Sequence, residues 1–286
     1  MRICDTLQFA VIGGDTRQLR LAELLRADGH RVHTFALERG DTGCAETAAA
    51  CVRNADCVIL PVPLSREQGM LNAPLSHVSH TVESIFAAIE PGTLVCVGGI
   101  RADTPPAPGL KLADYLARED LAIANSVPTA EGAIMIAMQE TPYTIHGCRA
   151  LVIGNGRCGR SLARRLAALG AHVAVSSRKA ADHAWVVSEG FEPLETGELE
   201  HLLGTFRLIF NTVPALVLGA AQLRHVSADA LVIDLASLPG GVEMDAAAER
   251  GVRVIRALSL PGKVAPETAA GIVRDTVYRI IEEAAK

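Results

Sequence analysis

Short apolar runs alternate along this chain with longer segments in which apolar residues recur at helical spacing. In the first half, the apolar runs lie near residues 8–13, 31–36, 56–60, 93–98 and 121–124. In the second half, they lie near residues 149–153, 172–176, 207–211, 230–234 and 252–256. Strands that alternate with helical segments in this way predict α/β domains with parallel sheets and helices on both faces.

Two long helices are predicted outside this alternation. The first covers residues 126–140, is densely apolar and follows the fifth predicted strand, and the second is amphipathic and covers the C-terminal residues 265–286. We expect one Rossmann-like domain over 1–125, with the C-terminal helix packing back on it, and a second Rossmann-like domain over 126–264. The predicted fold is therefore two Rossmann-like parallel-sheet domains with a cleft between them, joined by two long helices.

One sequence element occurs twice, once in each half. Residues 9–32 read FAVIGGDTRQLRLAELLRADGHRV, and residues 150–173 read ALVIGNGRCGRSLARRLAALGAHV. Many of their apolar positions agree, whereas the turn after the strand differs. The two halves therefore share a strand–turn–helix frame, and the turn decides what each frame binds.

The turn of the second copy has the spacing of a dinucleotide site. Its residues are Gly154, Asn155, Gly156, Arg157, Cys158 and Gly159. The first glycine permits a tight turn, the second lets a pyrophosphate approach the backbone, and the third lets the helix pack closely on the strand. The free N–H groups of the helix N-terminus favour phosphate. We expect the domain over 126–264 to bind a dinucleotide.

The next strand end favours NADP over NAD. An NAD site usually has Asp or Glu here for the ribose 2′-hydroxyl. This chain instead has Ser176, Ser177, Arg178 and Lys179. Two hydroxyls and two cations suit a 2′-phosphate, which a guanidinium binds through two hydrogen bonds. The alternative is that Arg178 and Lys179 are solvated charges at the start of a helix.

Two later strand ends are expected at the same edge of the sheet. Ligands of open α/β sheets bind beyond the carboxyl ends of the strands. The candidates for contact with the cofactor are Asn211, Thr212, Val213, Pro214, Asp234, Ala236 and Ser237. Asp234 has an equally good alternative, which is to cap the turn that follows its strand.

The turn of the first copy lacks the dinucleotide pattern. Asp15 stands at the second glycine position and Gln18 at the third. A carboxylate would repel a pyrophosphate, and Gln18 would disturb the close contact of helix and strand. Arg17 lies in the first helical turn, where the helix dipole disfavours a cation. Either Arg17 binds an anionic ligand, such as a substrate carboxylate, or it pairs with Asp15 at the surface.

Composition narrows the possible partners. Of the 286 residues, 49% are hydrophobic, and the formal net charge of −5 argues against nucleic acid. No run of about 18 apolar residues is present, so we expect no membrane span, and no signal peptide is evident. The seven cysteines form no CxxC pair, which indicates reduced thiols in a cytoplasm. The nine histidines show no metal-ligand spacing, so we expect no metal.

The motifs together resemble the family of the A subunit of dipicolinate synthase over essentially the whole length. The resemblance rests on IGGDTRQ at 12–18, NSVPTAEG at 125–132, YTIHG at 143–147, DLASLPGG at 234–241 and LPGKVAPETAAG at 260–271. It also runs through the second glycine turn. The first and last of these motifs are far more specific than GxGxxG alone.

The resemblance implies an activity, a cofactor and a partner. The activity is formation of pyridine-2,6-dicarboxylate from the dihydrodipicolinate-level product of the lysine pathway, with NADP as hydride acceptor. The partner is the smaller, flavoprotein-like B subunit of dipicolinate synthase. The resemblance places the enzyme in the cytoplasm of the mother cell during sporulation, and we expect a homo-oligomer.

A substrate with two carboxylates needs cations or helix N-termini at two separated positions. The resemblance therefore makes Arg17 and Lys263 candidates, the latter in the predicted loop before the C-terminal helix. The N-terminus of the helix that we expect near residue 126 is a third, with Asn125, Ser126 and Thr129 as donors. Two weaker candidates are Arg101 and His146.

If the true substrate is the hydroxylated tetrahydro compound, water must also leave. Glu131 or Lys263 could then act as acid or base. The alternatives are a favourable charge in a first helical turn for Glu131 and a solvated loop lysine for Lys263.

Two rival functions remain open at this point. One is another NADP-dependent dehydrogenase of a small carboxylic acid, with a 2-hydroxy, 2-amino or shikimate-like substrate. The other is a non-catalytic NADP-sensing subunit whose partner performs the chemistry. Binding of the cofactor without turnover would distinguish the second of these from an enzyme.

Overall fold

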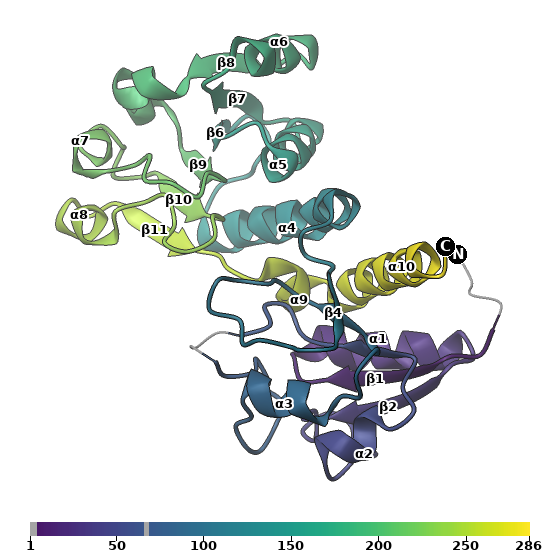
Figure 1. Cartoon of the computed structure of the whole chain (residues 1–286). Coiled ribbons are helices and arrows are strands. Elements are labelled where there is room, and N and C mark those ends of the chain that lie inside the picture. The colour runs from purple at the N-terminus through teal and green to yellow at the C-terminus, as the bar shows by residue number, and fades with distance from the viewer. Residues whose placement is uncertain (1–4, 66–68) are drawn as a thin grey trace. The chain divides into compact units, whose positions relative to one another are not determined.

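The computed structural model describes residues 5–65 and 69–286 of the chain, and Figure 1 gives the order of its elements. The chain divides into two compact units. The first contains Met1–Asn125 and Ala265–Lys286, and the second contains Ser126–Val264. Within the described residues each unit has a sheet whose strands are all parallel. These two parallel sheets confirm the predicted α/β fold class.

The first sheet has the strand order β2-β1-β3-β4-β5 in the described residues. Its strands are β1 (Gln8–Ile12), β2 (Arg31–Phe35), β3 (Cys57–Ile59), β4 (Leu94–Val97) and β5 (Lys111–Asp114). The order reverses between β1 and β3, which is the place where such sheets hold ligands. The register pairs Phe9 of β1 with Val32 of β2 and with Cys57 of β3.

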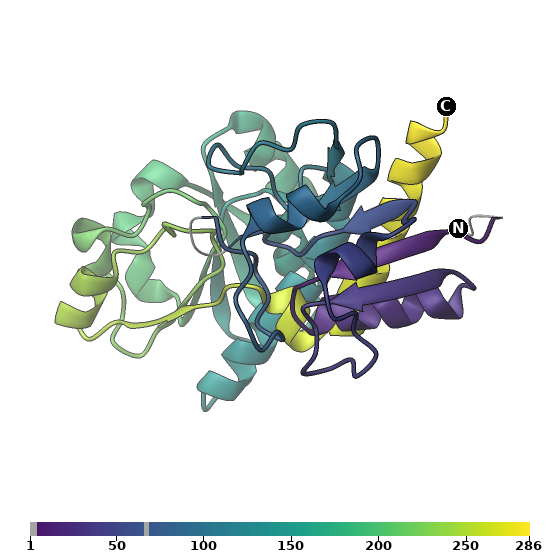
Figure 2. The same cartoon turned by 60° about the horizontal axis from the view of Figure 1, so that its bottom comes forward.

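Helices cover both faces of the first sheet (Figures 1 and 2). One face holds α1 (Thr16–Ala27) and the C-terminal α10 (Pro266–Ala284), and the other holds α2 (Ala48–Val52) and α3 (Val82–Ala88). Burial of Leu21 and Leu25 on α1 and of Val277 on α10 builds the first of these cores. Tyr278 of α10 donates a hydrogen bond to Asp28 at 2.9 Å, which fixes α10 beside the end of α1.

The second sheet has the order β11-β10-β9-β6-β7-β8 in the described residues. Its strands are β6 (Arg149–Ile153), β7 (His172–Ser177), β8 (Glu192–Glu195), β9 (Leu208–Asn211), β10 (Leu231–Asp234) and β11 (Arg253–Arg256). Here the order reverses between β6 and β9. The glycine turn follows β6, so it lies at this reversal, where dinucleotides bind in Rossmann folds.

Helices also cover both faces of the second sheet. On one face lie α4 (Glu119–Glu140, the part from Ser126 onward), α5 (Arg157–Ala168), α6 (Ala180–Ser188) and α9 (Leu260–Val264). On the other lie α7 (Ala220–Leu223), α8 (Met244–Glu249) and the short 3₁₀ segments Thr196–His201 and Leu203–Thr205. The unit therefore has its own core on each side of its sheet.

The prediction of a strand near 121–124 is wrong. This apolar run forms the beginning of α4, which starts at Glu119 and runs without a break to Glu140. A short apolar run does not distinguish a strand from a buried helix, and the acidic residues Glu119 and Asp120 favour a first helical turn. The fifth strand is instead Lys111–Asp114, which follows the Pro- and Gly-rich stretch of residues 98–109.

Two further elements were missed. β8 contains two glutamates and a proline and pairs with β7 alone in the described sheet, as edge strands with such residues do. The segment around Lys263, predicted as a loop, forms the short helix α9.

Among the described helices, α4 is long and apolar enough by composition to cross a membrane. Ala130, Ala133, Ile134 and Ala137 of this helix belong to the core of the second unit. A core helix of a globular domain accounts for that composition.

Candidate functional site: a dinucleotide pocket at the second glycine turn

A pocket of about 760 Å³ lies beyond the carboxyl ends of β6, β7 and β9. Many of the residues predicted to bind the cofactor line this pocket. They are Gly154, Asn155, Gly156, Arg157, Cys158, Ser177, Arg178, Lys179, Thr212, Val213 and Pro214. These residues come from three separate turns of the second unit. The sheet topology thus brings together the glycine turn, the cationic strand end and the Thr212–Pro214 turn.

The glycine turn is shaped for close approach of a ligand to the backbone. A β-carbon on Gly156 would meet no atom within 4 Å, so this position faces open space. A β-carbon on Gly159 would collide with the carbonyl oxygen of Gly154, which explains the third glycine. Gly154 has φ of +102°, in the left-handed region that favours glycine. Each glycine therefore has a distinct steric reason.

The N-terminus of α5 has a glycine as its N-cap. Gly156 occupies that position and makes no side-chain cap hydrogen bond. The first N–H groups of a helix lack intrahelical partners. An anion in the pocket would accept their hydrogen bonds and interact favourably with the helix dipole.

The strand end after β7 presents one buried hydroxyl and two exposed cations. Ser177 is 5% exposed and lines the pocket, and its Oγ has no hydrogen-bond partner among the described residues. Arg178 and Lys179 are exposed on the same wall. Asp182 also lines the pocket, but Arg160 lies 3.3 Å from its carboxylate. An orphaned hydroxyl beside two cations fits a phosphate or ribose group.

Ser176 does not take part in this wall. Its side chain is fully buried and its Oγ accepts a hydrogen bond from Thr196 at 3.3 Å. In a strand successive side chains point to opposite faces, so Ser176 and Ser177 cannot both face the same ligand.

The structure does not bring the side chains of Asn211 and Asp234 to the wall of the pocket. Both side chains are fully buried. The Asn211 amide donates to Asp234 at 2.8 Å and to the carbonyl of Val213 at 3.0 Å. Asp234 also accepts from the amides of Ala236 and Gly241, at 3.3 and 3.1 Å. Asp234 therefore caps its turn, which was the alternative interpretation.

Ala236 and Ser237 likewise do not line the pocket. Ala236 is buried, and its amide is held by Asp234. The network of Asn211 and Asp234 shapes the pocket indirectly, because it fixes the backbone just before Thr212–Pro214.

Other wall residues were not predicted. They are Asp182, Thr196, Gly197, Ala215, Leu216 and Val217. Thr196 and Gly197 follow β8, a strand that the sequence pattern did not reveal. Leu216 and Val217 extend the predicted Thr212–Pro214 turn, so proximity to that motif was the available signal.

The first glycine turn is closed by the chain itself. The amide of Gly14 donates to the carbonyl of Asn72 at 2.7 Å, and a β-carbon on Gly13 would lie 2.9 Å from Leu71. The residues after Asn72 also contact the end of β2, because the amide of His77 donates to the carboxylate of Glu38, just after that strand, at 3.3 Å. The segment 71–77 thus contacts the places that correspond to the nucleotide pocket of the second unit.

Arg17 is buried in the first unit and occupied by protein groups. Its guanidinium donates to Asp15 at 2.9 and 2.8 Å and to the carbonyl of Val62 at 2.7 Å. Asp15 also caps α1 by accepting from the Arg17 amide at 3.1 Å. Pairing with Asp15 is therefore present, in a buried rather than a surface setting. A role for Arg17 in substrate binding stays a prediction.

The helix N-terminus expected near residue 126 does not exist. Asn125, Ser126 and Thr129 lie inside α4, whose first residue is Glu119. Their backbone groups belong to the helix, so they offer no terminal N–H groups to a carboxylate. The reason is the misassigned strand at 121–124.

Glu131 and Lys263, the predicted acid or base, lie away from the walls of the nucleotide pocket. Glu131 is in the interior of α4, not in a first turn; its carboxylate is largely exposed and lies 3.6 Å from Arg165. Lys263 is exposed on α9. Their catalytic roles stay predictions. His146, a weaker candidate, packs against the turn at Gly170.

No group of three or more His, Cys, Asp or Glu residues within 5–65 and 69–286 is arranged to hold a metal ion. The groups that the second unit offers to a ligand are backbone amides, hydroxyls and cations around a pocket of nucleotide size.

The two halves of the chain match two different protein-family models. Residues 8–105 match the family model for the N-terminal domain of the A subunit of dipicolinate synthase. Residues 119–237 match the NAD-binding domain of the D-isomer-specific 2-hydroxyacid dehydrogenases. The second unit is therefore an NAD-binding domain of the dehydrogenase type, which supports an oxidoreductase.

Whole-chain relatives point the same way. The dipicolinate synthase A subunit of Bacillus subtilis (strain 168) is 35% identical over 97% of this chain and 96% of its own length. Crystal structures of the A subunit from Bacillus halodurans and from Bacillus subtilis are similar, each with a TM-score of 0.85 and with 33% and 32% identity. They cover 96% and 98% of this chain, and the matches include 99% and 97% of theirs. The chain belongs to the family of the dipicolinate synthase A subunit.

Proposed function

We propose that this protein oxidises dihydrodipicolinate to pyridine-2,6-dicarboxylate, with hydride transfer to NADP and release of a proton; if it starts from the hydroxylated tetrahydro precursor, water is lost as well. The observation that carries the proposal is the joint occurrence of the dipicolinate synthase N-terminal domain and a dehydrogenase-type nucleotide domain in one chain. Conversion of a dihydropyridine to a pyridine removes a hydride and a proton. Aromaticity favours that step, so the protein mainly has to orient its substrate.

The residues of the nucleotide pocket fit NADP. The amides at the α5 N-terminus, exposed by Gly156, would hold the pyrophosphate. The unpartnered hydroxyl of Ser177 and the exposed Arg178 and Lys179 would hold the 2′-phosphate. No acidic residue directly follows β7, where NAD sites usually have one. When bound, NADP supplies the hydride acceptor.

Protein groups then have to bind the two carboxylates and handle a proton. Lys263 and Glu131 remain the candidates for proton transfer, and Lys263 is the better placed chemically because its exposed ammonium has no ion-pair partner among the described residues. A changed pH profile of turnover in Lys263→Ala, with NADP affinity unchanged, would support this role. An unchanged profile would remove Lys263 from the mechanism.

The proposal includes a partner and a setting. By the relationship to the A subunit of dipicolinate synthase, a flavoprotein-like B subunit would associate with this chain. The reaction would branch from the lysine pathway, and its product would be used in sporulation. The reaction uses soluble metabolites, so we place it in the cytoplasm.

The test is a spectrophotometric assay of NADPH formation with freshly made lysine-pathway intermediate, with and without the B subunit. We expect turnover with NADP and with pyridine-2,6-dicarboxylate as product, identified by mass spectrometry. Gly156→Asp provides the matched inactive variant, because a carboxylate at that turn excludes the pyrophosphate.

Two outcomes would contradict the proposal. Binding of NADP without turnover, in the presence of both substrate and the B subunit, would favour a sensing role. Turnover of 2-hydroxy, 2-amino or shikimate-like acids, with none of the lysine-pathway intermediate, would favour another dehydrogenase.

A further inference from the structure

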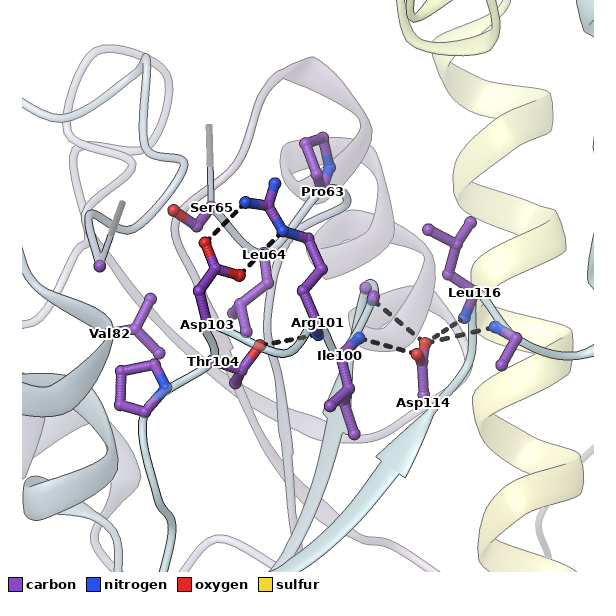
Figure 3. Close-up of a pocket in the computed structure, with 15 residues that line it drawn as sticks. Pro63, Leu64, Ser65, Val82, Ile100, Arg101, Asp103, Thr104, Asp114 and Leu116 are labelled. Atoms are coloured by element: carbon purple, nitrogen blue, oxygen red, sulfur yellow. Dashed lines mark hydrogen bonds and ion pairs between the residues drawn. The ribbon is translucent and has the colours of Figure 1, made fainter. Parts of the chain in front are cut away.

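The first unit contains a second pocket, of about 330 Å³, which the glycine motifs do not explain. It lies beyond the carboxyl ends of β3, β4 and β5, between the turn at Pro63–Ser65 and the loop at Gly98–Thr104 (Figure 3). The carboxyl edge of a parallel sheet is where ligands bind in open α/β folds. Ligand pockets run from roughly 300 to 1,000 Å³, so this one suits a small molecule.

The pocket is largely apolar apart from its charged loop residues. Leu64 and Val82 are buried in its wall, whereas Ile100 and Leu116 remain 46% and 39% exposed. Removal of exposed apolar surface from water is favourable. A ligand with a flat apolar body would therefore gain by covering Ile100 and Leu116.

Arg101 is the cation of this pocket among the described residues. Its Nε and one terminal nitrogen donate to the two oxygens of Asp103, at 3.0 and 2.7 Å (Figure 3). The loop that carries both residues is fixed, because the Arg101 amide donates to Thr104 Oγ1 at 2.9 Å. The guanidinium is thus held in the forked geometry that binds a carboxylate.

Asp103 occupies the position that a ligand carboxylate would take. The pair is exposed, with the Arg101 side chain 59% and the Asp103 side chain 37% accessible, and exposed ion pairs contribute little to stability. Exchange of Asp103 for another carboxylate therefore costs little. Rotation of the Asp103 side chain into solvent would free the fork.

The other carboxylate of the pocket, Asp114, is bound by backbone amides and not by Arg101. It accepts hydrogen bonds from the backbone amides of Gly99, Ile100, Leu116 and Ala117, at 3.1, 2.8, 2.8 and 3.3 Å. These donors stabilise its charge and hold the loop and the strand end together. Asp114 thereby builds the wall of the pocket and leaves Arg101 to recognise the ligand.

We infer that this pocket binds the ring acid of the reaction, with one carboxylate on Arg101 and the ring over Ile100 and Leu116. The inference rests on the proposed function, because that function supplies a planar ring with carboxylates. It replaces the helix N-terminus near residue 126 as the carboxylate site of the first unit.

The test is titration of the whole protein with pyridine-2,6-dicarboxylate, without NADP and in metal-free buffer. Calorimetry measures the affinity, and the methyl NMR signals of Ile100 and Leu116 report where the ligand binds. Arg101→Gln should weaken binding at least tenfold. Asp103→Asn should tighten it several-fold, since the internal competitor loses its charge. Arg164→Gln is the matched control: Arg164 forms a similar two-bond pair with Glu189 at 2.7 and 3.1 Å, outside both pockets, and should leave binding unchanged.

The two variants of this ion pair should change the ligand affinity in opposite directions. If the pair were only structural, its loss would reduce ligand affinity in both variants alike. Equal affinity in Arg101→Gln and the unmodified protein, or no binding of the unmodified protein at millimolar ligand, would overturn the inference. Since the titration does not depend on turnover, its failure leaves the NADPH assay as a separate test of the proposed function.

Discussion

The amide of Gly14 donates a hydrogen bond to the carbonyl of Asn72 at 2.7 Å, so the first glycine turn is occupied by a group of the same chain. In the second unit the corresponding turn faces an open pocket. The two copies of one strand–turn–helix frame have thus diverged in two ways. One change is Asp15 at the turn, and the other is the segment at Leu71–Asn72 that covers it.

This closure predicts one dinucleotide per chain. Asp15→Gly should not create a second site, because Leu71 and the Asn72 carbonyl remain at the turn and Gln18 remains on α1. We expect calorimetric titration with NADP to give a stoichiometry of one for the unmodified protein and for Asp15→Gly. A second bound nucleotide in either protein would contradict the assignment.

A second prediction concerns cofactor choice. Arg178→Ala should weaken NADP binding much more than NAD binding, since only NADP carries the 2′-phosphate. A hydrogen bond to a charged group contributes roughly 1.5–3 kcal/mol, so NADP affinity should fall about tenfold to a hundredfold. Fluorescence titration with both cofactors measures the ratio. Equal losses for NADP and NAD would show that the Ser177–Lys179 turn does not bind the phosphate.

The sequence predicts the part of this site whose chemistry is local. Gly154, Gly156 and Gly159 are required by backbone geometry within a single turn, so their spacing alone indicates their function. Ser177 differs from Ser176 only by the alternation of a strand, and that register depends on how β7 pairs with its neighbours. The sequence therefore predicts the glycine turn correctly, but the predicted phosphate site also includes Ser176, whose side chain faces away from the pocket.

Tertiary contacts decide the positions where the structure departs from the pattern of the sequence. Asn211 and Asp234 are polar residues at strand ends, as cofactor ligands often are, yet adjacent strands bring them together and they satisfy each other. The run 121–124 is apolar enough for a strand, yet it continues into a helix that the core of the second unit stabilises. Neither outcome follows from local pattern, because both depend on which neighbours the fold provides.

The Asp234 network gives a third prediction, on stability. Asp234→Ala would remove one of the two acceptors of the Asn211 side-chain amide, the acceptor of the Gly241 amide and the 3.8 Å partner of Arg256. Removal of one member of a buried charged network costs about 3–5 kcal/mol. Urea unfolding followed by the fluorescence of Trp185, the single tryptophan and a residue of the second unit, measures this loss.

Glu249→Ala is the control for that experiment, since Glu249 is an exposed residue at the end of α8. Its effect should stay within about 0.5 kcal/mol. If Asp234→Ala unfolds at the same urea concentration as Glu249→Ala, the network does not stabilise the turn.

The last prediction concerns alkaline pH. Burial raises the pKa of Tyr115 well above its ordinary value of 10.0, and its hydroxyl donates to the carbonyl of Leu60 at 2.7 Å. Burial, together with the hydrogen bond to Asp28, raises the pKa of Tyr278 in the same way, and burial also raises the pKa of Tyr143. These are all three tyrosines of the chain. In the folded protein, none of the three hydroxyls should ionise at the pH at which an unperturbed tyrosine does.

The sign of the stability effect follows from these directions. Because the folded pKa of Tyr115 exceeds the unfolded one, its contribution is fully present below pH 10.0 and declines as the pH rises toward the folded pKa. Tyr115 should lower the free energy of unfolding by about 1.4 kcal/mol per pH unit in that range. The ultraviolet signal of tyrosinate should therefore appear together with loss of circular dichroism, and Tyr115→Phe should reduce the slope of stability against pH. A reversible tyrosinate signal near pH 10 from a protein with intact circular dichroism would show that these side chains are open to solvent.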